Sequence, residues 1–129
     1  MKIEHIGITV TAPHTMAQWY ADNLGFRIIR KSGDDVRGGV FVLDESGETI
    51  LELFATEGAD PFVSNPASPL TVHIAFESES FDSDIEKLKK AGAEFLEEST
   101  PPGAETRMAL LKDPWGITLQ LAKRKEKLL

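Results

Sequence analysis

The sequence predicts an α+β fold in which two tandem β-α-β-β-β modules form a curved, mixed to antiparallel sheet of eight strands, with both helices on its outer face. Three observations support this fold class. Two segments have helical spacing of apolar residues, each is preceded by one strand-like segment and followed by three, and polar residues recur at matched spacing in the two halves. A chain of 129 residues is long enough for one domain with a hydrophobic core.

Two segments have the pattern of amphipathic helices. The first covers residues 13–23 and has a proline in its first turn. The second covers residues 81–91, with acidic residues in its first turn and lysines in its last, an order that complements the helix dipole. A glycine follows each segment, Gly25 and Gly92, where a left-handed residue commonly closes a helix.

Strand-like segments surround the two helices in the same order. The expected strands are residues 3–10, 26–31, 39–43 and 49–55 in the first half, and 70–77, 93–97, 106–112 and 117–122 in the second. A stretch rich in Pro, Ala, Ser and Gly separates the halves. The predicted organisation is a single domain, with module one at 1–56, a linker at 57–69, module two at 70–123 and a basic tail at 124–129.

The two modules match each other in sequence as well as in element order. "EHIGITV" aligns with "VHIAFES" at the first strand, and "ILELFA" aligns with "TLQLAK" at the fourth. Glu52 follows His5 by 47 positions, and Gln120 follows His73 by the same 47 positions. Strand alternation places all four residues on the face that points away from the helix. Leu70 and Val72 are expected on the other face, packed under the second helix.

These four side chains are candidate metal ligands. Glu52 interrupts an apolar run, and the burial of an unpaired carboxylate is costly. A structural histidine or an exposed glutamate would explain each residue singly, but four donors at matched spacing favour one shared site. The chain has no cysteine, so thiolate ligands are excluded. Two histidines, a carboxylate and an amide oxygen suit one divalent ion of Zn, Ni, Fe, Mn or Co.

Composition narrows the partners. A net charge of −7 argues against a nucleic-acid partner. The longest apolar runs are no longer than a strand, which argues against a membrane span. The start of the chain lacks the apolar core of a signal peptide, so a cytoplasmic location is expected. A homodimer is expected, because an open sheet leaves edges and apolar side chains to cover. The expected ligand is a small-molecule substrate.

The motifs "HIGITV", "WYADNLGF", "VHIAFES" and "LLKDPWGITLQL" resemble the vicinal oxygen chelate superfamily, which includes glyoxalases, bleomycin resistance proteins and extradiol dioxygenases. The resemblance covers nearly the whole chain and implies metal ligation by His5, Glu52, His73 and Gln120. It implies a lyase or isomerase that binds two adjacent substrate oxygens and stabilises an enediolate. Glu52 would then be a ligand or a displaceable base, and Gln120 would orient substrate or bound water.

The sequence leaves several alternatives open. The last strand usually carries Glu in this superfamily, and here it carries Gln120, which leaves the general base unassigned. The donors are compatible with a site within one chain or across a dimer. A metal-free, bleomycin-resistance-like binding protein is one alternative function, and an Fe(II) extradiol-type dioxygenase is another. Thr9 stands where glyoxalase I carries its glutathione-binding arginine. The methylglyoxal-glutathione hemithioacetal is therefore expected to be a poor substrate.

Two further side chains and one loop are weaker candidates for the substrate site. Arg107 is a possible anion contact in the seventh strand, although a surface arginine is an equally good interpretation. Trp115 is a possible cover for the pocket, with packing of its own turn as the competing role. The loop at residues 100–103 is a candidate lid, or an ordinary loop.

Overall fold

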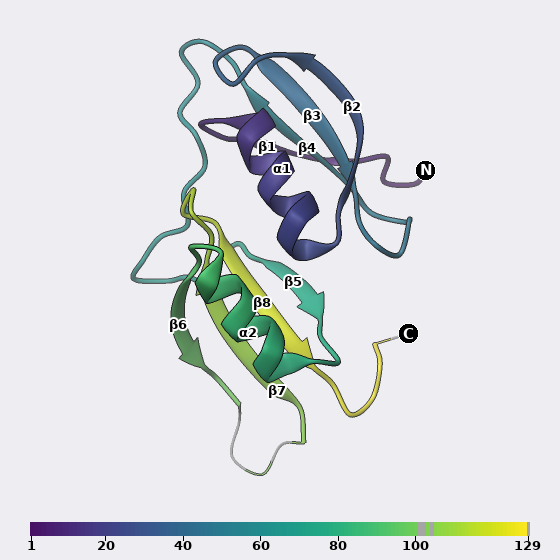
Figure 1. Ribbon diagram of the computed structural model, residues 1–129, viewed down its shortest axis with the longest axis vertical. Helices are drawn as coiled ribbons and strands as arrows, with labels where there is room; N and C mark the ends of the chain where they lie inside the picture. Colours follow the sequence, from purple (N-terminus) through teal and green to yellow (C-terminus); the bar gives the residue numbers. More distant parts are fainter. Residues whose placement is uncertain (101–102, 104, 129) are drawn as a thin grey trace. The chain divides into compact units, whose positions relative to one another are not determined.

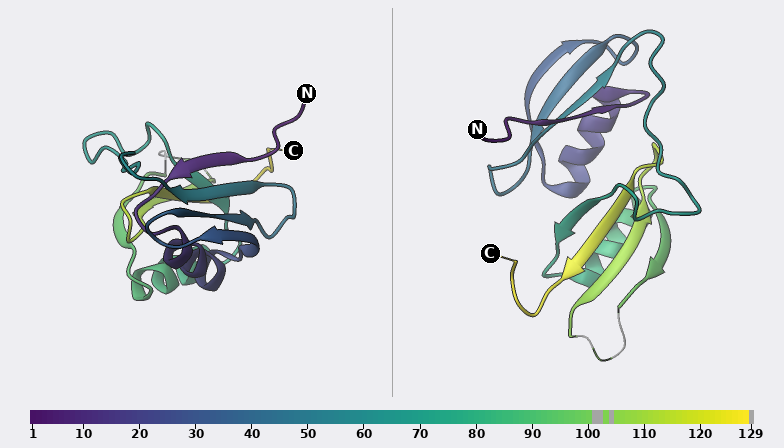
Figure 2. Two further views of the ribbon diagram at one scale, coloured as in Figure 1. Left: turned by 90° about the horizontal axis from the view of Figure 1, so that it is seen from above. Right: turned by 180° about the vertical axis from the view of Figure 1, so that it is seen from behind.

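The structure is a computed structural model that describes residues 1–100, 103 and 105–128. The chain divides into two compact units, Met1–Phe62 (unit 1) and Val63–Leu129 (unit 2), as Figure 1 shows. The boundary between the units falls inside the predicted linker, residues 57–69. Figure 2 gives two further views of the same elements.

Unit 1 is one β-α-β-β-β module with a four-stranded mixed sheet. Its strands have the order β1-β4-β3-β2, in which β1 is parallel to β4 and the other neighbours are antiparallel. The elements are β1 (Ile6–Thr9), α1 (Pro13–Leu24), β2 (Arg27–Gly33), β3 (Gly38–Leu43) and β4 (Ile50–Ala55).

Unit 2 repeats this topology. The strand order is β5-β8-β7-β6, with β5 parallel to β8 and the other neighbours antiparallel. Both second strands carry a register shift at the same place, between Ile28 and Arg30 in unit 1 and between Phe95 and Glu97 in unit 2. The elements are β5 (Ile74–Glu77), α2 (Phe81–Lys90), β6 (Glu94–Glu98), β7 (Arg107–Lys112) and β8 (Thr118–Lys123).

The predicted fold class is confirmed, and the strands of the described residues are grouped as two sheets of four. Two strands are shorter than predicted at their N-terminal ends, so His5 and His73 each lie one residue before a strand. The cause is the parallel ladder. It begins at Ile6 opposite Leu51, and β4 itself begins one residue earlier, so the residues that precede His5 have no strand to pair with.

The core of each unit lies between its helix and one face of its sheet. In unit 1 the helix residues Met16 and Tyr20 are fully buried, as are the strand residues Val40, Val42 and Leu53. Full burial of such a side chain stabilises the fold by about 1.5–3 kcal/mol. Because side chains alternate along a strand, the residues between these core positions face away from α1, on what we call the helix-free face.

In unit 2 the helix contributes Phe81, Ile85 and Leu88 to the core. The prediction that Leu70 and Val72 pack under this helix is wrong, since they are 48% and 54% exposed. These residues precede β5 in a turn, where the N–H of Thr71 donates to the carbonyl of Ser68 (3.1 Å), and strand alternation does not apply to a turn.

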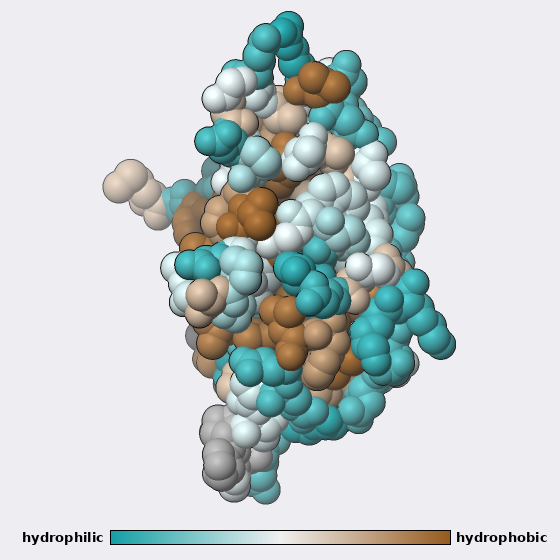
Figure 3. Space-filling model, turned by 90° about the vertical axis from the view of Figure 1, so that its left-hand side faces the viewer, coloured by the Kyte–Doolittle hydropathy of each residue, from teal (hydrophilic) through white to brown (hydrophobic). Residues whose placement is uncertain are grey.

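Both helix ends confirm the role predicted for glycine. Gly25 has a φ of 75° and its N–H donates to the carbonyl of Tyr20, while Gly92 has a φ of 102°. Among the described residues, no helix combines the length and the apolar character needed to cross a bilayer. Apolar side chains do reach the surface, Ile29 and Val36 among them, and Figure 3 shows brown patches between polar ones on one face.

Candidate functional site

The helix-free face of unit 1 brings His5 and Glu52 together. Glu52 lies in β4, directly opposite Gly7 of the neighbouring parallel strand β1. His5 lies one residue before that strand, two positions from Gly7. The Nε2 atom of His5 is 3.3 Å from Oε2 of Glu52, and the two side chains are 32% and 28% exposed. The pair is therefore accessible from solvent.

His5 has two further contacts that fix its ring. Its Nδ1 is hydrogen-bonded to the carboxylate of Glu4. Its ring packs against the ring of Phe41 in a T-shaped arrangement, with the two ring centroids 5.4 Å apart. The hydrogen bond to Glu4 is the main cause that raises the pKa of His5 above 6.5, and the charges of Glu4 and Glu52 add to it against the opposing effect of desolvation.

The spacing of this pair suits two ligands of one cation. Ligand bonds of about 2.1 Å that meet at about 90–109° place the two donor atoms about 3.0–3.4 Å apart. The Nε2–Oε2 distance of 3.3 Å lies inside that range. A carboxylate on the far nitrogen, as Glu4 is here, is the usual partner of a metal-ligating histidine. His5 and Glu52 therefore fit a divalent ion.

Gln120 occupies the corresponding place in unit 2. It lies in β8 between Ala75 of β5 and Leu110 of β7, and it is only 7% exposed. Within the described part of the chain its amide has no hydrogen-bond partner, and no fully buried side-chain N or O atom lacks one. Its amide tip therefore remains open to solvent and has its donor and acceptor available for a ligand.

His73 is exposed and lies one residue before β5. Its Nδ1 donates a hydrogen bond to the carbonyl oxygen of Leu70 at 3.1 Å, because a carbonyl can only accept. This contact assigns the proton of the neutral ring to Nδ1 and leaves the lone pair of Nε2 available. His73 thus has the tautomer that ligation through Nε2 requires.

Each unit thus supplies two of the four predicted ligands. No group of three or more His, Asp or Glu side chains is gathered within the parts of the chain described, 1–100, 103 and 105–128. His5 and Glu52 are close enough to share a ligand, and Gln120 and His73 offer free donor atoms on the matching elements of unit 2. A joint site made by all four remains a prediction.

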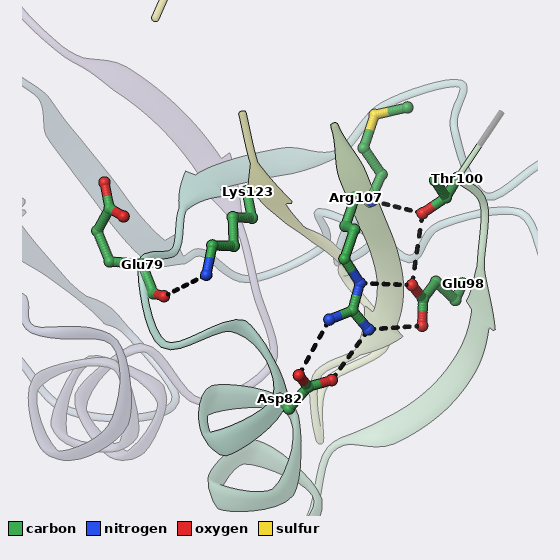
Figure 4. A network of polar contacts seen from close by, with 7 residues as sticks. Glu79, Asp82, Glu98, Thr100, Arg107 and Lys123 are labelled. Carbon is green, nitrogen blue, oxygen red and sulfur yellow. Dashed lines mark hydrogen bonds and ion pairs between the residues drawn. The ribbon is translucent and has the colours of Figure 1, made fainter. Parts of the chain in front are cut away.

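Arg107 has a structural environment instead of an open one. Its guanidinium forms a two-point pair with Asp82 (3.0 and 2.9 Å), bonds Glu98 at 2.9 and 3.2 Å, and lies 4.4 Å from the ring centroid of Phe81, as Figure 4 shows in part. The two carboxylates raise its pKa further above the ordinary value. Because Arg107 contacts α2, it lies on the opposite face of the sheet from Gln120, and we do not place it in the substrate site.

Trp115 is half-buried in the turn between β7 and β8. The backbone N–H of Trp115 donates to Oδ1 of Asp113 at 2.9 Å, and the backbone N–H of Ile117 donates to the same oxygen at 2.9 Å. These bonds shape the turn, and a role for Trp115 in covering a pocket stays a prediction. In the candidate lid, Pro101 and Pro102 lie outside the described residues.

A family model described as the Glyoxalase/Bleomycin resistance protein/Dioxygenase superfamily matches residues 2–121. The chain belongs to this superfamily. A curated relative, the uncharacterized protein YaeR of Escherichia coli (strain K12), is 24% identical over 124 residues, which are 93% of this chain and 94% of YaeR.

Solved structures of the superfamily share the fold. The fosfomycin resistance protein FosX from Listeria monocytogenes has a TM-score of 0.74 and 18% identity over 99% of this chain and 95% of its own. A mutant of FosX was solved in complex with Mn(II) and 1S,2S-dihydroxypropylphosphonic acid. A mutant of glyoxalase I from Zea mays has a TM-score of 0.74 and 21% identity, over 97% of this chain and 46% of the longer maize chain.

Sequence reasoning gave no role to Phe41 and Phe54, the two phenyl rings next to Glu52. Phe41 pairs with Glu52 across β3 and β4, and Phe54 lies two residues beyond Glu52 on the same face. The alternation of buried valines and leucines in β3 and β4 carried the signal, because it assigns Phe41 and Phe54 to the helix-free face. Glu4 gave no signal, since a carboxylate next to a histidine in sequence has no preferred orientation.

Proposed function

We propose that the protein is a metal-dependent enzyme that binds one divalent cation through His5, Glu52, His73 and Gln120 and acts on a small substrate with two adjacent oxygen atoms. The reaction class is that of a glyoxalase-like lyase or isomerase. The observation that carries the proposal is the 3.3 Å separation of His5 Nε2 and Glu52 Oε2, which suits two ligands of one ion.

The comparisons support the proposal at the level of the superfamily. FosX, which shares the fold, has been crystallised with Mn(II) together with a compound that has hydroxyl groups on adjacent carbon atoms. The match of residues 2–121 to the superfamily model includes all four proposed ligands. The ion is Zn, Ni, Fe, Mn or Co, and its site forms either within one chain or across the proposed homodimer.

The proposed roles follow from the contacts of each side chain. His5 and His73 present Nε2 to the ion, with Nδ1 held by Glu4 and by the carbonyl of Leu70. Glu52 is a ligand, and its partly exposed carboxylate is also the proposed general base. The free amide of Gln120 either ligates weakly or orients the substrate and nearby water through hydrogen bonds.

A bound divalent ion would supply a Lewis acid that stabilises negative charge on the two substrate oxygens. With two neutral histidines, one carboxylate and one amide, the formal charge of the site is about +1. This charge favours a substrate with an anionic oxygen. The side chains around the site then have to hold the substrate, exclude water and accept the proton that is moved.

The test is a metal titration of chelator-treated protein by calorimetry, together with elemental analysis. We expect about one ion per chain, and we expect Glu52→Gln and His5→Ala to weaken binding by at least tenfold, since loss of even a supporting residue commonly costs about 10–100-fold. His14→Ala is the matched control. His14 lies in α1, where its Nε2 is 3.0 Å from the carbonyl oxygen of Ser32, and it is not a proposed ligand.

The same titration separates the alternatives. No uptake of any of the five metals would leave a metal-free binding protein as the better function. Uptake of Fe(II) with ring cleavage of catechols in the presence of oxygen would identify an extradiol-type dioxygenase instead of a lyase or isomerase.

A further inference from the structure

Glu52 has different neighbours on the two sides of its strand, and its neighbours also differ from those of Gln120, the matching residue of unit 2. On the helix-free face of unit 1, Glu52 lies between Gly7 of β1 and Phe41 of β3. In the next pair of positions, Phe54 of β4 lies between Thr9 of β1 and Gly39 of β3. The carboxylate therefore has the phenyl ring of Phe41 beside it and that of Phe54 beyond it along β4, while on the β1 side it meets the ring of His5 and, at Gly7 directly opposite, no side chain.

Gly7 presents no side chain to the carboxylate of Glu52. A Cβ atom at this position would lie 3.4 Å from Oε2 of Glu52 and 3.5 Å from Cε1 of Phe54, which is ordinary van der Waals contact. Its φ is not positive, so the backbone does not require glycine there. Glycine weakens a strand, and a common reason for its presence is the close approach of another molecule. The absent side chain leaves Oε2 of Glu52 and the edge of the Phe54 ring uncovered at this position, with space for about one methyl group between them.

The two phenyl rings are only half-buried, unlike their neighbours in the same strands. Val40, Val42 and Leu53 face α1 and are fully buried, whereas Phe41 and Phe54 keep part of their surface in solvent. An aromatic ring that is left partly exposed next to a charged group offers a binding surface for a flat apolar group.

Unit 2 lacks this arrangement although it has the same topology. The positions that correspond to Gly7, Phe41 and Phe54 are Ala75, Leu110 and Ala122, as the pairing around Gln120 shows. Leu110 is fully buried and Ala122 is 4% exposed. The exposed rings and the missing side chain thus occur together around Glu52 and not around Gln120.

We propose that Gly7, Phe41 and Phe54 form a subsite for a flat apolar group, such as an aryl ring, attached to the two-oxygen part of the substrate. This inference rests on the proposed function and narrows its substrate class to aryl-substituted compounds with two adjacent oxygens, for example an aryl 2-hydroxy or 2-oxo acid. Gly7 leaves Oε2 of Glu52 and the edge of Phe54 uncovered, the two rings provide the apolar contact, and the shared neighbour Glu52 places this group beside the reacting oxygens.

Two hydroxamates test the proposal because both chelate a metal through two adjacent oxygens and differ only in the attached group. Benzohydroxamate carries a phenyl ring and acetohydroxamate carries a methyl group. Calorimetry on the metal-loaded protein should give a tighter complex for benzohydroxamate. Phe54→Ala and Gly7→Ala, which adds only the Cβ atom, should each weaken benzohydroxamate by about fivefold to tenfold, the size of an aromatic contact, and change acetohydroxamate by less than about twofold.

Phe95→Ala is the matched control, because Phe95 is a 40% exposed phenyl ring in β6 of unit 2. It should leave both affinities unchanged. Phe54→Leu keeps an apolar side chain without the ring and serves if Phe54→Ala does not fold, while the Cβ of Gly7→Ala makes only ordinary van der Waals contacts.

The outcomes separate the two proposals. Metal uptake with equal changes for both hydroxamates in the Gly7 and Phe54 variants would overturn the aryl subsite and leave the metal site standing. Failure of the parent protein to take up any metal would overturn the proposed function, and the aryl subsite with it.

Discussion

The Nε2 atom of His5 lies 3.3 Å from Oε2 of Glu52, across the neighbouring strands β1 and β4. These residues are 47 positions apart in sequence, and the parallel pairing of Gly7 with Glu52 is what brings them together. The same pairing in unit 2 sets Ala75 opposite Gln120. The repeat therefore presents one donor from a central strand and one histidine from the start of an edge strand in each unit.

Replacement of Glu4 by Gln should lower the pKa of His5. The hydrogen bond to Glu4 is the main cause of the raised value, so its loss moves the pKa back toward 6.5. A raised pKa contributes stability that is fully present below the unfolded value and is lost as pH rises through the folded value. The metal-free variant should therefore lose stability at acid pH relative to the parent and gain none above the folded pKa.

NMR titration of the imidazole signals in metal-free Glu4→Gln measures this shift, and Glu126→Gln in the tail is the control for loss of a carboxylate. Because Glu4 supports the far nitrogen of the proposed ligand His5, the variant should also bind metal about 10–100-fold more weakly than the parent does. An unchanged His5 pKa would show that Glu4 does not hold the ring in solution.

Asp35 caps α1 from the loop between β2 and β3. Its Oδ1 accepts the backbone N–H groups of His14 (2.7 Å) and Thr15 (3.0 Å), and its Oδ2 accepts the Thr15 hydroxyl (2.6 Å). The residue before the helix, Ala12, provides no side-chain cap. Asp35→Ala should lower the free energy of unfolding by about 1 kcal/mol, the usual cost of a lost cap.

The pH dependence of this cap has a defined sign. The Thr15 hydroxyl and the two N–H groups lower the pKa of Asp35 below 3.8. The stabilisation is therefore present above that value and is lost as pH falls through the lower, folded pKa. Denaturant unfolding at pH 7 and pH 3 should show a smaller difference between Asp35→Ala and the parent at pH 3. Asp60→Ala, in the predicted linker, should show no such difference.

Arg107→Lys should destabilise unit 2 without an effect on metal binding. Lysine keeps the charge but cannot reproduce the two-point pair with Asp82 or the contacts with Glu98, which Figure 4 shows. Thermal unfolding should give a lower midpoint for Arg107→Lys than for Lys112→Ala, which removes a single ion pair with Glu94. Weaker binding of metal or of acetohydroxamate by Arg107→Lys would return Arg107 to the substrate site.

Local sequence patterns were sufficient for most of the fold. Helical spacing located α1 and α2, and Gly25 and Gly92 marked their ends, because both signals depend on neighbouring residues only. The length of β1 was not predictable in this way. A strand ends where its partner ends, and the start of β4 at Ile50 limits the ladder.

Strand alternation assigned His5 and Glu52 to the face opposite the helix, and the parallel pairing of β1 with β4 brings them together. Alternation could not assign Arg107 or Asp35. Alternation is a rule about one strand, and it does not say which carboxylates on other elements a long side chain reaches. Arg107 contacts residues 25 and 9 positions away, and Asp35 caps a helix that starts 22 positions earlier. Such contacts follow from packing between elements, for which the sequence gives no short-range signal.

Glu52 and Gln120 occupy matching positions of the two units but differ in charge. If both reach one ion, Gln120→Glu adds a second carboxylate and lowers the charge of the ligand set by one. A more negative set holds a divalent cation more tightly and polarises bound oxygens less. Glu52→Gln should do the opposite and lose metal by at least about tenfold.

The double variant Glu52→Gln with Gln120→Glu keeps the charge and exchanges the two positions. Metal affinity should recover in it, because the donor set is the same. Hydroxamate binding and activity should recover only in part, because Glu52 lies beside Gly7 and 3.3 Å from His5, whereas Gln120 is 7% exposed between Ala75 and Leu110. Calorimetric metal titration of the three variants decides the matter. Unchanged affinity in Glu52→Gln would mean that Glu52 is not a ligand, and full recovery of activity in the double variant would mean that its position is irrelevant to proton transfer.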